Sequence, residues 1–448
     1  MEKSNLPIAV IGLGKTGISI AKYLKKNNQN FLVYDTRINL EITNEIKKYV
    51  SKENIILGDF KKKYIEDHDN FVISPGINLK NSLLNEIANK RKNIQTDIDI
   101  FNDRKRDNVI CITGSNGKTT VTLIIEHILK SLGKKVKAGG NVGLPALELL
   151  EDNYQYNILE LSSFQLEMTK KINSVAALIT NITPDHLDRH KTFENYIKIK
   201  HKVFKNSKNI IINLTDKNIR KNDYKYKFSF GGIDKKESNF SVHREREVNY
   251  IYQGLKKLIS EKDILLMGYH NLINICASLT VIESLGLDIQ KSIKSIKEFK
   301  CVEHRMESFY SKENITWIND SKSTNIDSTI SAINSLDNFT ILLMGGKSKT
   351  NNYKSLEMAA HNKVDTLILF GECRKLLKEN IKSVKNIIMV KSLDKAVIEA
   401  MKSAENIRKN YQNNINILLS PACSSFDMFK SYEERGVFFK ECVLNLYR

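Results

Sequence analysis

The chain has 448 residues, which is too long for one hydrophobic core and fits two or three domains. With 41% hydrophobic and 27% charged residues, it has the composition of an ordinary globular protein. No apolar run reaches the length of a membrane span, and the opening MEKSNLPIAVIGLG lacks a signal-peptide layout. We therefore expect a cytoplasmic protein without a membrane span.

The formal net charge of +19 raises the question of nucleic-acid binding. The lysines are spread along the chain instead of gathering in one basic patch with interleaved aromatic residues. This spread favours a lysine-rich solvated surface, which also suits small anionic substrates, over a nucleic-acid partner. The cysteines lack the paired spacing of a disulfide framework or a zinc site, so we expect reduced thiols at Cys111, Cys276, Cys301, Cys373, Cys423 and Cys442.

The first α/β block begins with the predicted strand in IAVIGLGKTG (8–17), whose glycines follow a Gly-x-Gly-x-x-Gly pattern. A helical stretch and the strand FLVYD follow, ending at Asp35. An acid about twenty residues after the glycine turn is typical of a Rossmann half, where it binds a ribose hydroxyl. The strand in FVISPGI (71–77) ends in a turn of the kind that binds ligands. The glycine pattern alone also fits tight packing of a helix on a strand.

The second block contains VICITGSNGKTTVTLIIEHILKSLG (109–133), an apolar strand, a glycine turn and an amphipathic helix. Backbone N–H groups from Gly114 onwards can face an anion at the helix N-terminus. Lys118 can reach the outer phosphates of a nucleotide, and the hydroxyl of Thr119 can ligate Mg²⁺. Although Ile112 replaces the first glycine of the Walker pattern, these residues predict ATP or GTP binding.

Two more predicted strands of this block end in polar residues. YNILELSSFQLE supplies Glu160, Ser162 and Gln165, and VAALITNITPDHLDRH supplies Asn181, Asp185, His186 and His190. In a parallel sheet these strand ends open on the same side as the phosphate loop. Glu160 and His186 are therefore candidate Mg²⁺ ligands. A surface residue at a helix start is the alternative for His186.

The third block alternates strands with helices, which predicts a second Rossmann-like parallel sheet. Strands are expected in 339–346, 365–372, 386–390 and 416–422. The predicted fold class is α/β with three domains. They are an N-terminal Rossmann-like domain (1–95), a central P-loop ATPase-type parallel sheet (96–301) and a C-terminal Rossmann-like domain (302–448).

Seven motifs occur in one order along the chain: GSNGKTT, ELSSFQLE, NITPDHLDRH, FENYIKIKHKVF, GYHNLINICAS, HRME and INDSKSTN. In order and spacing they resemble the Mur ligases, ATP-dependent amide-forming enzymes of bacterial cell-wall synthesis that are related to folylpolyglutamate synthases. GLGKTG, Asp35-Thr36-Arg37, Ser74-Pro75-Gly76 and SPACSSFDMFKSYEERG are most similar to the members that add D-glutamate. The resemblance implies ATP, Mg²⁺, UDP-N-acetylmuramoyl-L-alanine and D-glutamate as ligands. We expect a monomer without a nucleic-acid partner.

The resemblance also implies a role for each matching residue. Phosphate and first-metal contacts fall to Gly114, Ser115, Asn116, Gly117, Lys118, Thr119 and Thr120. Glu160 would be a metal ligand, His186 would bind a second Mg²⁺, and a carbamate on Lys200 would bridge toward that metal. The remaining ATP contacts would be Asn271, Asn274, Arg305 and Asp320. The implied catalytic residues are Lys118, Glu160, His186 and Lys200, and the base for the attacking amine stays unassigned.

Substrate contacts follow from the same resemblance. The UDP substrate would contact Thr16, Asp35, Thr36, Arg37, Ser74, Pro75, Gly76, Asn141, Ser162 and Gln165. D-Glutamate would contact Lys322, Ser323, Thr324, Lys349, Ser425 and Tyr432. The chain departs from the family pattern at three places: it lacks a glycine shortly before HRME, has Lys347-Ser348 where Asp-Gly is usual, and has Tyr432 where another aromatic residue is frequent.

Other functions fit fewer of these features. A P-loop ATPase acting on nucleic acid would need a basic groove and motor motifs, and a dinucleotide oxidoreductase would leave the phosphate loop unexplained. Folylpolyglutamate synthases begin with the ATPase domain, and the sibling ligase for diaminopimelate or lysine usually carries an Asn-Pro-Arg motif that is missing here. The sequence therefore favours D-glutamate ligation through an acyl phosphate.

Overall fold

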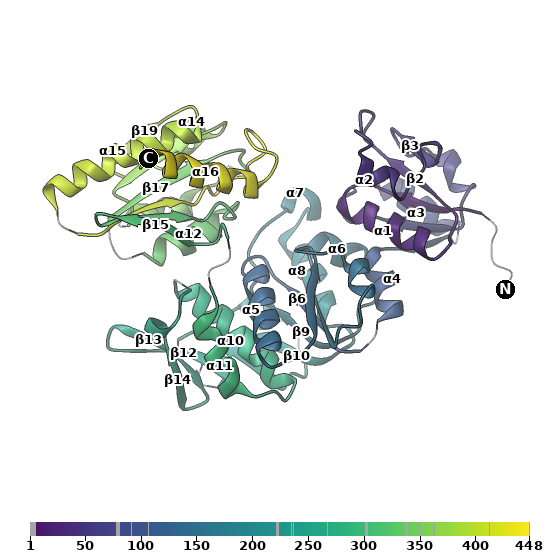
Figure 1. The fold of residues 1–448 in the computed structure, drawn as a ribbon, viewed down its shortest axis with the longest axis horizontal. Coiled ribbons are helices and arrows are strands. Elements are labelled where there is room, and N and C mark those ends of the chain that lie inside the picture. Colours follow the sequence, from purple (N-terminus) through teal and green to yellow (C-terminus); the bar gives the residue numbers. More distant parts are fainter. Residues whose placement is uncertain are drawn as a thin grey trace. The chain divides into compact units, whose positions relative to one another are not determined.

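The computed structural model describes residues 6–77, 81–90, 92–105, 107–220, 224–233, 235, 237–266, 268–300, 303–336, 339–349, 352–361, 363–411 and 413–447. They form three sheets within two compact units (Figure 1). The first unit contains the residues up to Arg244, Tyr250–Ile259 and Asn274–Ile296, and the second contains Glu245–Asn249, Ser260–Ile273 and the residues from Lys297 on. Cys301 lies outside the described residues.

The first sheet is parallel, with strand order β3-β2-β1-β4-β5. Its strands are β1 (Ile8–Ile11), β2 (Phe31–Asp35), β3 (Ile55–Leu57), β4 (Asn70–Ile73) and β5 (Asn93–Gln95). Its helices are α1 (Lys15–Lys26), α2 (Asn44–Lys47), η1 (Lys52–Asn54), η2 (Lys62–Ile65) and α3 (Asn81–Asn89). A Cβ on Gly17 would lie 1.8 Å from the carbonyl oxygen of Gly12, so this glycine lets α1 pack closely on β1. The order is that of a Rossmann half, as predicted.

The second sheet has the order β14-β13-β12-β11-β10-β9-β6-β8-β7. Its strands are β6 (Val109–Thr113), β7 (Val136–Gly140), β8 (Tyr156–Glu160), β9 (Ser174–Ile179), β10 (Ser207–Asn213), β11 (Phe228–Gly231), β12 (Phe240–Glu245), β13 (Val248–Gln253) and β14 (Lys256–Ser260). Its helices are α4 (Asp97–Arg104), α5 (Lys118–Ser131), η3 (Ala146–Leu150), α6 (Ser163–Met168), α7 (Leu187–His190), α8 (Phe193–His201), η4 (Lys202–Phe204), α9 (Lys217–Arg220), η5 (Glu261–Asp263), α10 (Tyr269–Ser284) and α11 (Ile289–Glu298). Because β6 pairs in parallel with both β8 and β9, the carboxyl ends of these three strands meet at one edge.

Helix α5 follows from its sequence. Gly117 precedes it with a φ of 79°, which an L side chain rarely adopts. Its buried face carries the predicted apolar residues, Val121, Ile124, Ile125, Ile128 and Leu129. The helix stops before Gly133, whose φ of 73° provides a left-handed ending.

The third sheet has the order β15-β16-β20-β17-β18-β19. Its strands are β15 (Glu307–Lys312), β16 (Ile315–Asn319), β17 (Phe339–Gly345), β18 (Thr366–Phe370), β19 (Asn386–Met389) and β20 (Ile415–Leu419). Its helices are α12 (Ile326–Asn334), α13 (Lys354–His361), α14 (Arg374–Asn380), α15 (Leu393–Asn410) and α16 (Tyr432–Leu446). β15 and β16 form an antiparallel hairpin at one edge, which the sequence prediction did not include. The other pairings are parallel.

Both faces of the third sheet are buried. Alternate residues of β17 point to opposite faces of the sheet. Leu342 and Met344 pack in a cluster with residues of α12, α13 and α14. Ile341 and Leu343 pack in a cluster with residues of α15 and α16. Such burial on both sides explains why its central strands are continuous apolar runs. The described residues are thus mixed α/β in three parallel-rich sheets, as predicted, and the domain limits 1–95, 96–301 and 302–448 stay predictions.

No helix in the described part of the chain is long and apolar enough to cross a membrane.

Candidate active site

The phosphate loop joins β6 to α5, and hydrogen bonds with the segment after β9 hold it in place. The N–H of Ser115 donates to the carbonyl oxygen of Asn181 at 2.8 Å, and the N–H of Asn116 donates to Oδ1 of Asn181 at 2.9 Å. The hydroxyl of Thr180 donates to the carbonyl oxygen of Asn116 at 2.6 Å. The loop is therefore held by hydrogen bonds from a neighbouring strand end.

Two glycines of the loop are required by close contacts. Gly114 has a φ of 151°, and a Cβ there would lie 1.9 Å from Oγ1 of Thr180. A Cβ on Gly117 would lie 2.5 Å from Oδ1 of Asn274. The second contact brings Asn274, a predicted ATP contact on α10, to the phosphate loop.

Two lysines from different elements converge on this loop. Nζ of Lys118 donates to the carbonyl oxygens of Gly114 and Ser115 at 2.8 and 2.9 Å. Nζ of Lys200, on α8, donates to the same carbonyl of Gly114 at 2.7 Å and lies 4.7 Å from the centre of the Tyr196 ring. The structure thus places the two predicted catalytic lysines at one oxygen atom.

Lys200 is almost completely buried, with 1% of its surface exposed. Burial and the nearby charge of Lys118 hold its pKa well below the usual range for lysine. The charges of Asp185 and Glu160 oppose this lowering but are smaller causes. The Lys200 side chain is therefore a buried amine that loses its proton more readily than an exposed lysine does.

Glu160 ends β8 and is 1% exposed. Its Oε1 accepts a hydrogen bond from the side-chain amide of Asn141 at 2.7 Å, whereas its buried Oε2 has no hydrogen-bond partner among the residues that the structure describes. A buried carboxylate oxygen without a partner is costly unless a cation or donor meets it. Glu160 and Thr119, the second residue of α5, therefore offer oxygen ligands of the kind that Mg²⁺ prefers.

Among the described residues, no group of three or more His, Cys, Asp or Glu side chains is arranged to hold a metal ion. Mg²⁺ is commonly bound by one or two carboxylates together with water and substrate phosphates. His186 precedes α7 with a φ of 53°, its Nε2 lies 3.5 Å from Oδ2 of Asp185, and its ring contacts Phe164. Its predicted role as a metal ligand stays a prediction.

The predicted UDP-substrate residues of the first sheet lie at the carboxyl ends of β1, β2 and β4. Asp35 is buried, and its Oδ2 accepts a hydrogen bond from the N–H of Leu13 at 2.7 Å. Burial opposes ionisation of Asp35, but hydrogen bonds from Arg37 and Leu13 hold its pKa below the usual value. Both carboxylate oxygens already accept hydrogen bonds from Arg37 within the chain. Thr36 is exposed beside them, and Thr16 is half-buried in the first turn of α1.

Ser74 connects β4 to the glycine turn after β1. Its N–H donates to the carbonyl oxygen of Ile11 at 2.9 Å, and a Cβ on Gly12 would lie 3.0 Å from the Ser74 Cβ. Pro75 is buried and Gly76 is exposed in the same turn. The predicted residues after β1 and β4 are thus neighbours in the fold.

Ser162 and Gln165 have a structural role that the sequence prediction missed. They form a capping box at the start of α6, in which Oγ of Ser162 accepts from the N–H of Gln165 at 3.2 Å and Oε1 of Gln165 accepts from the N–H of Ser162 at 2.9 Å. Such reciprocal bonds satisfy the unpaired donors of a helix start. Their assignment to the UDP substrate stays a prediction.

Most of the predicted residues of the second unit follow β16, β17 or β20 in the chain. Asp320 is buried, and its carboxylate accepts from the hydroxyls of Ser323 at 2.5 Å and Ser420 at 2.9 Å. Burial raises the pKa of Asp320 to about 6, while these hydrogen bonds and the charge of Arg305 act in the opposite direction. Asp320 and Arg305, both predicted ATP contacts, thus influence each other electrostatically. Asn271, in the first turn of α10, also belongs to this unit.

Four of the six predicted amino-acid contacts form two pairs. Nζ of Lys322 lies 3.9 Å from the centre of the Tyr432 ring, a cation–π contact. Nζ of Lys349 donates to Oγ1 of Thr324 at 3.4 Å, although Lys349 is largely exposed. Ser425 is buried in the loop after β20. The structure thus brings the loops after β16 and β17 together.

The unusual Lys347-Ser348 pair does not disrupt the backbone of its loop. Lys347 and Ser424 form a bridge in which each N–H donates to the other's carbonyl oxygen, at 2.9 and 3.0 Å. Because these bonds use only backbone atoms, the loop keeps its place whatever side chain stands at 347. Lys349 consequently keeps its position next to Thr324.

One residue that the sequence prediction missed is Arg435, on α16. It is completely buried and donates from Nε and Nη2 to the hydroxyl and carbonyl oxygens of Ser321 at 3.0 and 2.8 Å, and from Nη1 to the carbonyl oxygens of Cys423 and Gly345 at 3.1 and 3.4 Å. One guanidinium therefore ties together the loops after β16, β17 and β20. The motif SPACSSFDMFKSYEERG contains Arg435 but carries no local signal of its burial.

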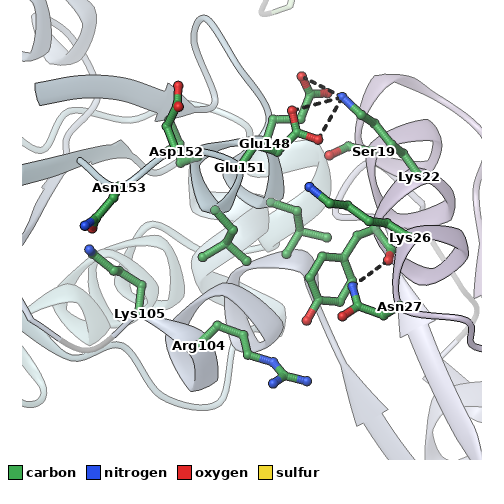
Figure 2. Close-up of a pocket in the computed structure, with 14 residues that line it drawn as sticks. Ser19, Lys22, Lys26, Asn27, Arg104, Lys105, Glu148, Glu151, Asp152 and Asn153 are labelled. Carbon is green, nitrogen blue, oxygen red and sulfur yellow. Dashed lines mark hydrogen bonds and ion pairs between the residues drawn. The ribbon is translucent and has the colours of Figure 1, made fainter.

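A separate pocket of about 570 Å³ lies in the first unit, between α1 and η3 (Figure 2). Figure 2 shows Lys22 reaching toward Glu148 and Glu151, and its Nζ lies 3.9 and 3.1 Å from their carboxylates. Within the described part of the chain, its lining includes none of the predicted site residues. The pocket is therefore distinct from the phosphate-loop cluster.

Comparisons with known proteins agree with this geometry. Three family models match consecutive parts of the chain: the Mur ligase MurD-like N-terminal domain at residues 7–96, the Mur ligase middle domain at 112–282 and the Mur ligase glutamate ligase domain at 304–423. A UDP-N-acetylmuramoylalanine–D-glutamate ligase of Legionella pneumophila (strain Paris) is 34% identical over 448 residues, which cover 98% of each chain.

The fold is also similar to solved structures. A pseudomurein peptide ligase type C from Methanothermus fervidus matches with a TM-score of 0.63 and 20% identity, covering 99% of this chain and 100% of that one. MurF ligase from Thermotoga maritima in complex with ADP matches with a TM-score of 0.59 and 18% identity, covering 99% of this chain and 97% of that one. Given the phosphate loop with its two lysines and the full-length similarity to the Legionella enzyme, the chain belongs to the Mur ligase family.

Proposed function

We propose that the chain is an ATP-dependent ligase that joins D-glutamate to UDP-N-acetylmuramoyl-L-alanine during peptidoglycan precursor synthesis in the cytoplasm. The relative from Legionella pneumophila is named for this activity and is similar over 98% of each chain. The observation that carries the proposal is the convergence of Lys118 and Lys200 on the Gly114 carbonyl, beside Glu160. This arrangement suits a crowded set of phosphate oxygens.

The reaction needs activation because a carboxylate is a poor acylating agent. The carboxylate of the UDP substrate attacks the γ-phosphorus of ATP, which gives an acyl phosphate and ADP. The amine of D-glutamate then attacks the acyl carbon, and the tetrahedral intermediate collapses to an amide and inorganic phosphate. Lys118 and the N-terminal N–H groups of α5 would neutralise the charge that develops on the transferred phosphoryl group.

Mg²⁺ would fit the oxygen atoms beside the loop. Glu160 has one buried oxygen without a partner, and Thr119 stands in the first turn of α5. Bound there, Mg²⁺ would supply further positive charge against the phosphate oxygens. Asn141 holds the other oxygen of Glu160 and so orients the carboxylate toward this position. His186 is proposed for a second ion.

Lys200 is proposed to be carbamylated. Its lowered pKa favours a neutral amine, which can attack CO₂ and lose a proton to form a carbamate. The product places an anion next to the cation of Lys118, so the two side chains attract each other. The carbamate would be one more oxygen ligand on the metal side of the phosphate loop.

The loops after β16, β17 and β20 are proposed to hold D-glutamate. Its two carboxylates need cations and hydrogen-bond donors, and Lys322, Lys349 and Thr324 stand on these loops. Ser323 donates to Asp320, and Ser425 is buried behind the loop surface. This set favours a small dianion over a neutral amino acid.

The test is release of inorganic phosphate from ATP with UDP-N-acetylmuramoyl-L-alanine as acceptor. D-Glutamate, L-glutamate, L-alanine and diaminopimelate are offered in parallel, and we expect release with D-glutamate alone. Release with a different amino acid would keep the ligase but change its specificity. Silence with all four would contradict the proposed function and favour an ATPase of another kind.

A further inference from the structure

Two buried cysteines lie in contact within the third sheet's loops. Cys373 precedes α14 and Cys423 follows β20, and their Sγ atoms are 3.3 Å apart. Cys373 is 6% exposed and Cys423 is fully buried. The two residues are 50 positions apart in sequence, so no local spacing identifies them as a pair.

The surroundings of the pair favour a thiolate at Cys423. Hydrogen bonding from the Cys373 thiol lowers the pKa of Cys423, and burial opposes this. The Tyr353 hydroxyl, 3.8 Å from Sγ of Cys423, and the charge of Arg435 lower it further. The thiolate is the nucleophilic form of cysteine. Cys423 therefore stands next to donors that stabilise its reactive form and next to a second thiol.

Both cysteines touch the loops that carry the proposed D-glutamate contacts. The N–H of Cys373 donates to the carbonyl oxygen of Gly346 at 3.0 Å. A Cβ on Gly346 would lie 3.3 Å from the Cβ of Cys423, and Ser425 follows two residues later. Movement of either sulfur is therefore transmitted to the loops that hold Lys349 and Ser425.

We propose that Cys373 and Cys423 form a reversible oxidation site, at which hydrogen peroxide converts the two thiols into a disulfide that impairs use of the amino-acid substrate. The effect on catalysis rests on the function proposed above, whereas disulfide formation does not. Disulfides inside cells are characteristically transient and regulatory, which fits a pair without a framework role.

The chemistry balances with one peroxide. The first thiol is oxidised when its sulfur attacks a peroxide oxygen, the O–O bond breaks, and a sulfenic acid and one water form. The second thiol then attacks the sulfenic sulfur, the S–O bond breaks, and a disulfide and a second water form. Two thiols lose two electrons, and the peroxide gains them.

Closing the bond requires the two sulfur atoms to move closer together. The Sγ atoms must approach from 3.3 Å to about 2.05 Å, the length of a disulfide bond. A misplacement of about 1 Å at substrate contacts can cost on the order of 100-fold in rate. We therefore expect oxidation to lower kcat/KM for D-glutamate about 10- to 100-fold.

The first arm of the test maps the bond in the full chain. The protein is treated with hydrogen peroxide, quenched with catalase, alkylated and digested for mass spectrometry. We expect one cross-linked peptide pair joining Cys373 to Cys423, which dithiothreitol releases. Cys373→Ser and Cys423→Ser should each abolish it, and the control Cys442→Ser should not. Absence of this linkage in the wild-type chain would overturn the proposal.

The second arm measures D-glutamate kinetics before and after oxidation. Wild-type enzyme should lose activity and regain it with dithiothreitol, whereas Cys373→Ser should be insensitive to peroxide. Should Cys373→Ser not fold, Cys373→Ala takes its place, and the oxidised wild-type chain still decides the outcome. A formed disulfide with unchanged kinetics would overturn the regulatory part. Failure of the reduced wild-type enzyme with D-glutamate would instead count against the proposed function, and the mapped bond would still stand.

Discussion

The phosphate loop of the first unit and the loops after β16, β17 and β20 of the second unit, which are proposed to hold D-glutamate and are called the amino-acid loops below, are both built around cations, but in different ways. At the phosphate loop, the functional lysines themselves are fixed, since Lys118 and Lys200 both donate to backbone carbonyls. At the amino-acid loops, Lys349 is exposed, and the fixed cation is Arg435, whose donors go to the backbone and one serine. At the phosphate loop, hydrogen bonds hold the functional lysines themselves in place. At the amino-acid loops, the buried Arg435 holds the backbone, and the exposed lysines are less constrained.

This difference predicts where substitutions act. Removing a fixed lysine from the phosphate loop should affect the chemical step, because these groups are proposed to meet the reacting phosphoryl oxygens. Removing an exposed lysine from the amino-acid loops should weaken binding of D-glutamate and leave ATP use unchanged. Five experiments test this contrast.

Lys118→Ala should have the largest effect. Loss of its charge from the transferred phosphoryl group should lower kcat about 1,000-fold or more. Phosphate release measures this, and circular dichroism checks that the fold is intact. Lys198→Ala, an exposed lysine on α8, is the matched control and should keep normal turnover. Unchanged turnover in Lys118→Ala would contradict the assignment of the phosphate loop.

The buried acids of the two units sharpen the comparison through pH. Burial raises the pKa of Asp97 to about 7, and its Oδ1 has no partner, whereas the hydrogen-bonded Asp320 is raised to about 6. Because the folded chain holds these two protons more tightly than the unfolded chain, the contribution of Asp97 and Asp320 to stability should be greatest near pH 4 and fall as the pH rises toward 7. The contribution of Asp97 is at most about 4 kcal/mol.

Urea unfolding of wild type and Asp97→Asn across this pH range measures that contribution. The variant cannot ionise at this position, so its unfolding free energy should fall less between pH 4 and 7 than that of wild type. Asp320→Asn provides the matched comparison in the second unit. It should reduce the pH dependence of the unfolding free energy by less than Asp97→Asn does. Parallel curves for Asp97→Asn and wild type would show that Asp97 keeps an ordinary pKa in the folded chain.

Lys200→Ala should lower turnover about 100-fold, a smaller loss than for Lys118 because the proposed carbamate would act on the metal side of the loop. Acetate or bicarbonate should restore part of the activity by supplying a carboxylate in the space that the side chain leaves. Lys198→Ala should show neither the loss nor the rescue. A Lys200→Ala enzyme of normal activity, indifferent to both anions, would argue against the carbamate.

Arg435→Lys should weaken the support of the amino-acid loops. A lysine has one nitrogen and cannot bridge three loops, so buried carbonyl oxygens lose their donors, at a cost of about 2 kcal/mol in unfolding free energy. Urea denaturation measures the loss, and KM for D-glutamate should rise with it. The exposed Arg408→Lys on α15 serves as control. Equal unfolding free energies for Arg435→Lys and Arg408→Lys would contradict the proposal that Arg435 supports the amino-acid loops.

Lys349→Ala should have the smallest effect. Loss of one exposed cation should raise KM for D-glutamate about tenfold, equivalent to about 1.4 kcal/mol, with KM for ATP unchanged. Lys347→Ala, exposed two residues earlier, is the control, because its loop is held by backbone bonds to Ser424. A larger effect for Lys347 than for Lys349 would mean that the Lys347-Ser348 departure shifts the substrate contact.

Local patterns predicted much of the central site. The apolar strand, the positive-φ glycines and the helical spacing after Lys118 are short-range features, and the structure confirms β6, the loop and α5. The parallel pairing of β6 with β8 and β9 confirms that Glu160 ends its strand at the edge where the loop lies. These features depend on neighbours in sequence, which is why the sequence reveals them.

The features that the sequence did not predict depend on burial and on contacts between residues far apart in the chain. Lys198, Lys200 and Lys202 lie on one basic segment, and only the fold shows that Lys200 faces the interior. Arg435 contacts Ser321, 114 residues away, which no local pattern encodes. The hairpin of β15 and β16 was missed because its turn, Glu313-Asn314, adopts positive φ at both residues without the usual glycine.

The most direct test of the proposed ligase mechanism follows oxygen. UDP-N-acetylmuramoyl-L-alanine is labelled with ¹⁸O in its terminal carboxylate and turned over with ATP and D-glutamate, and the released phosphate is analysed by mass spectrometry. An acyl-phosphate pathway predicts that each phosphate carries one ¹⁸O atom from the substrate carboxylate. Phosphate that forms together with the amide product but carries no label would contradict the mechanism.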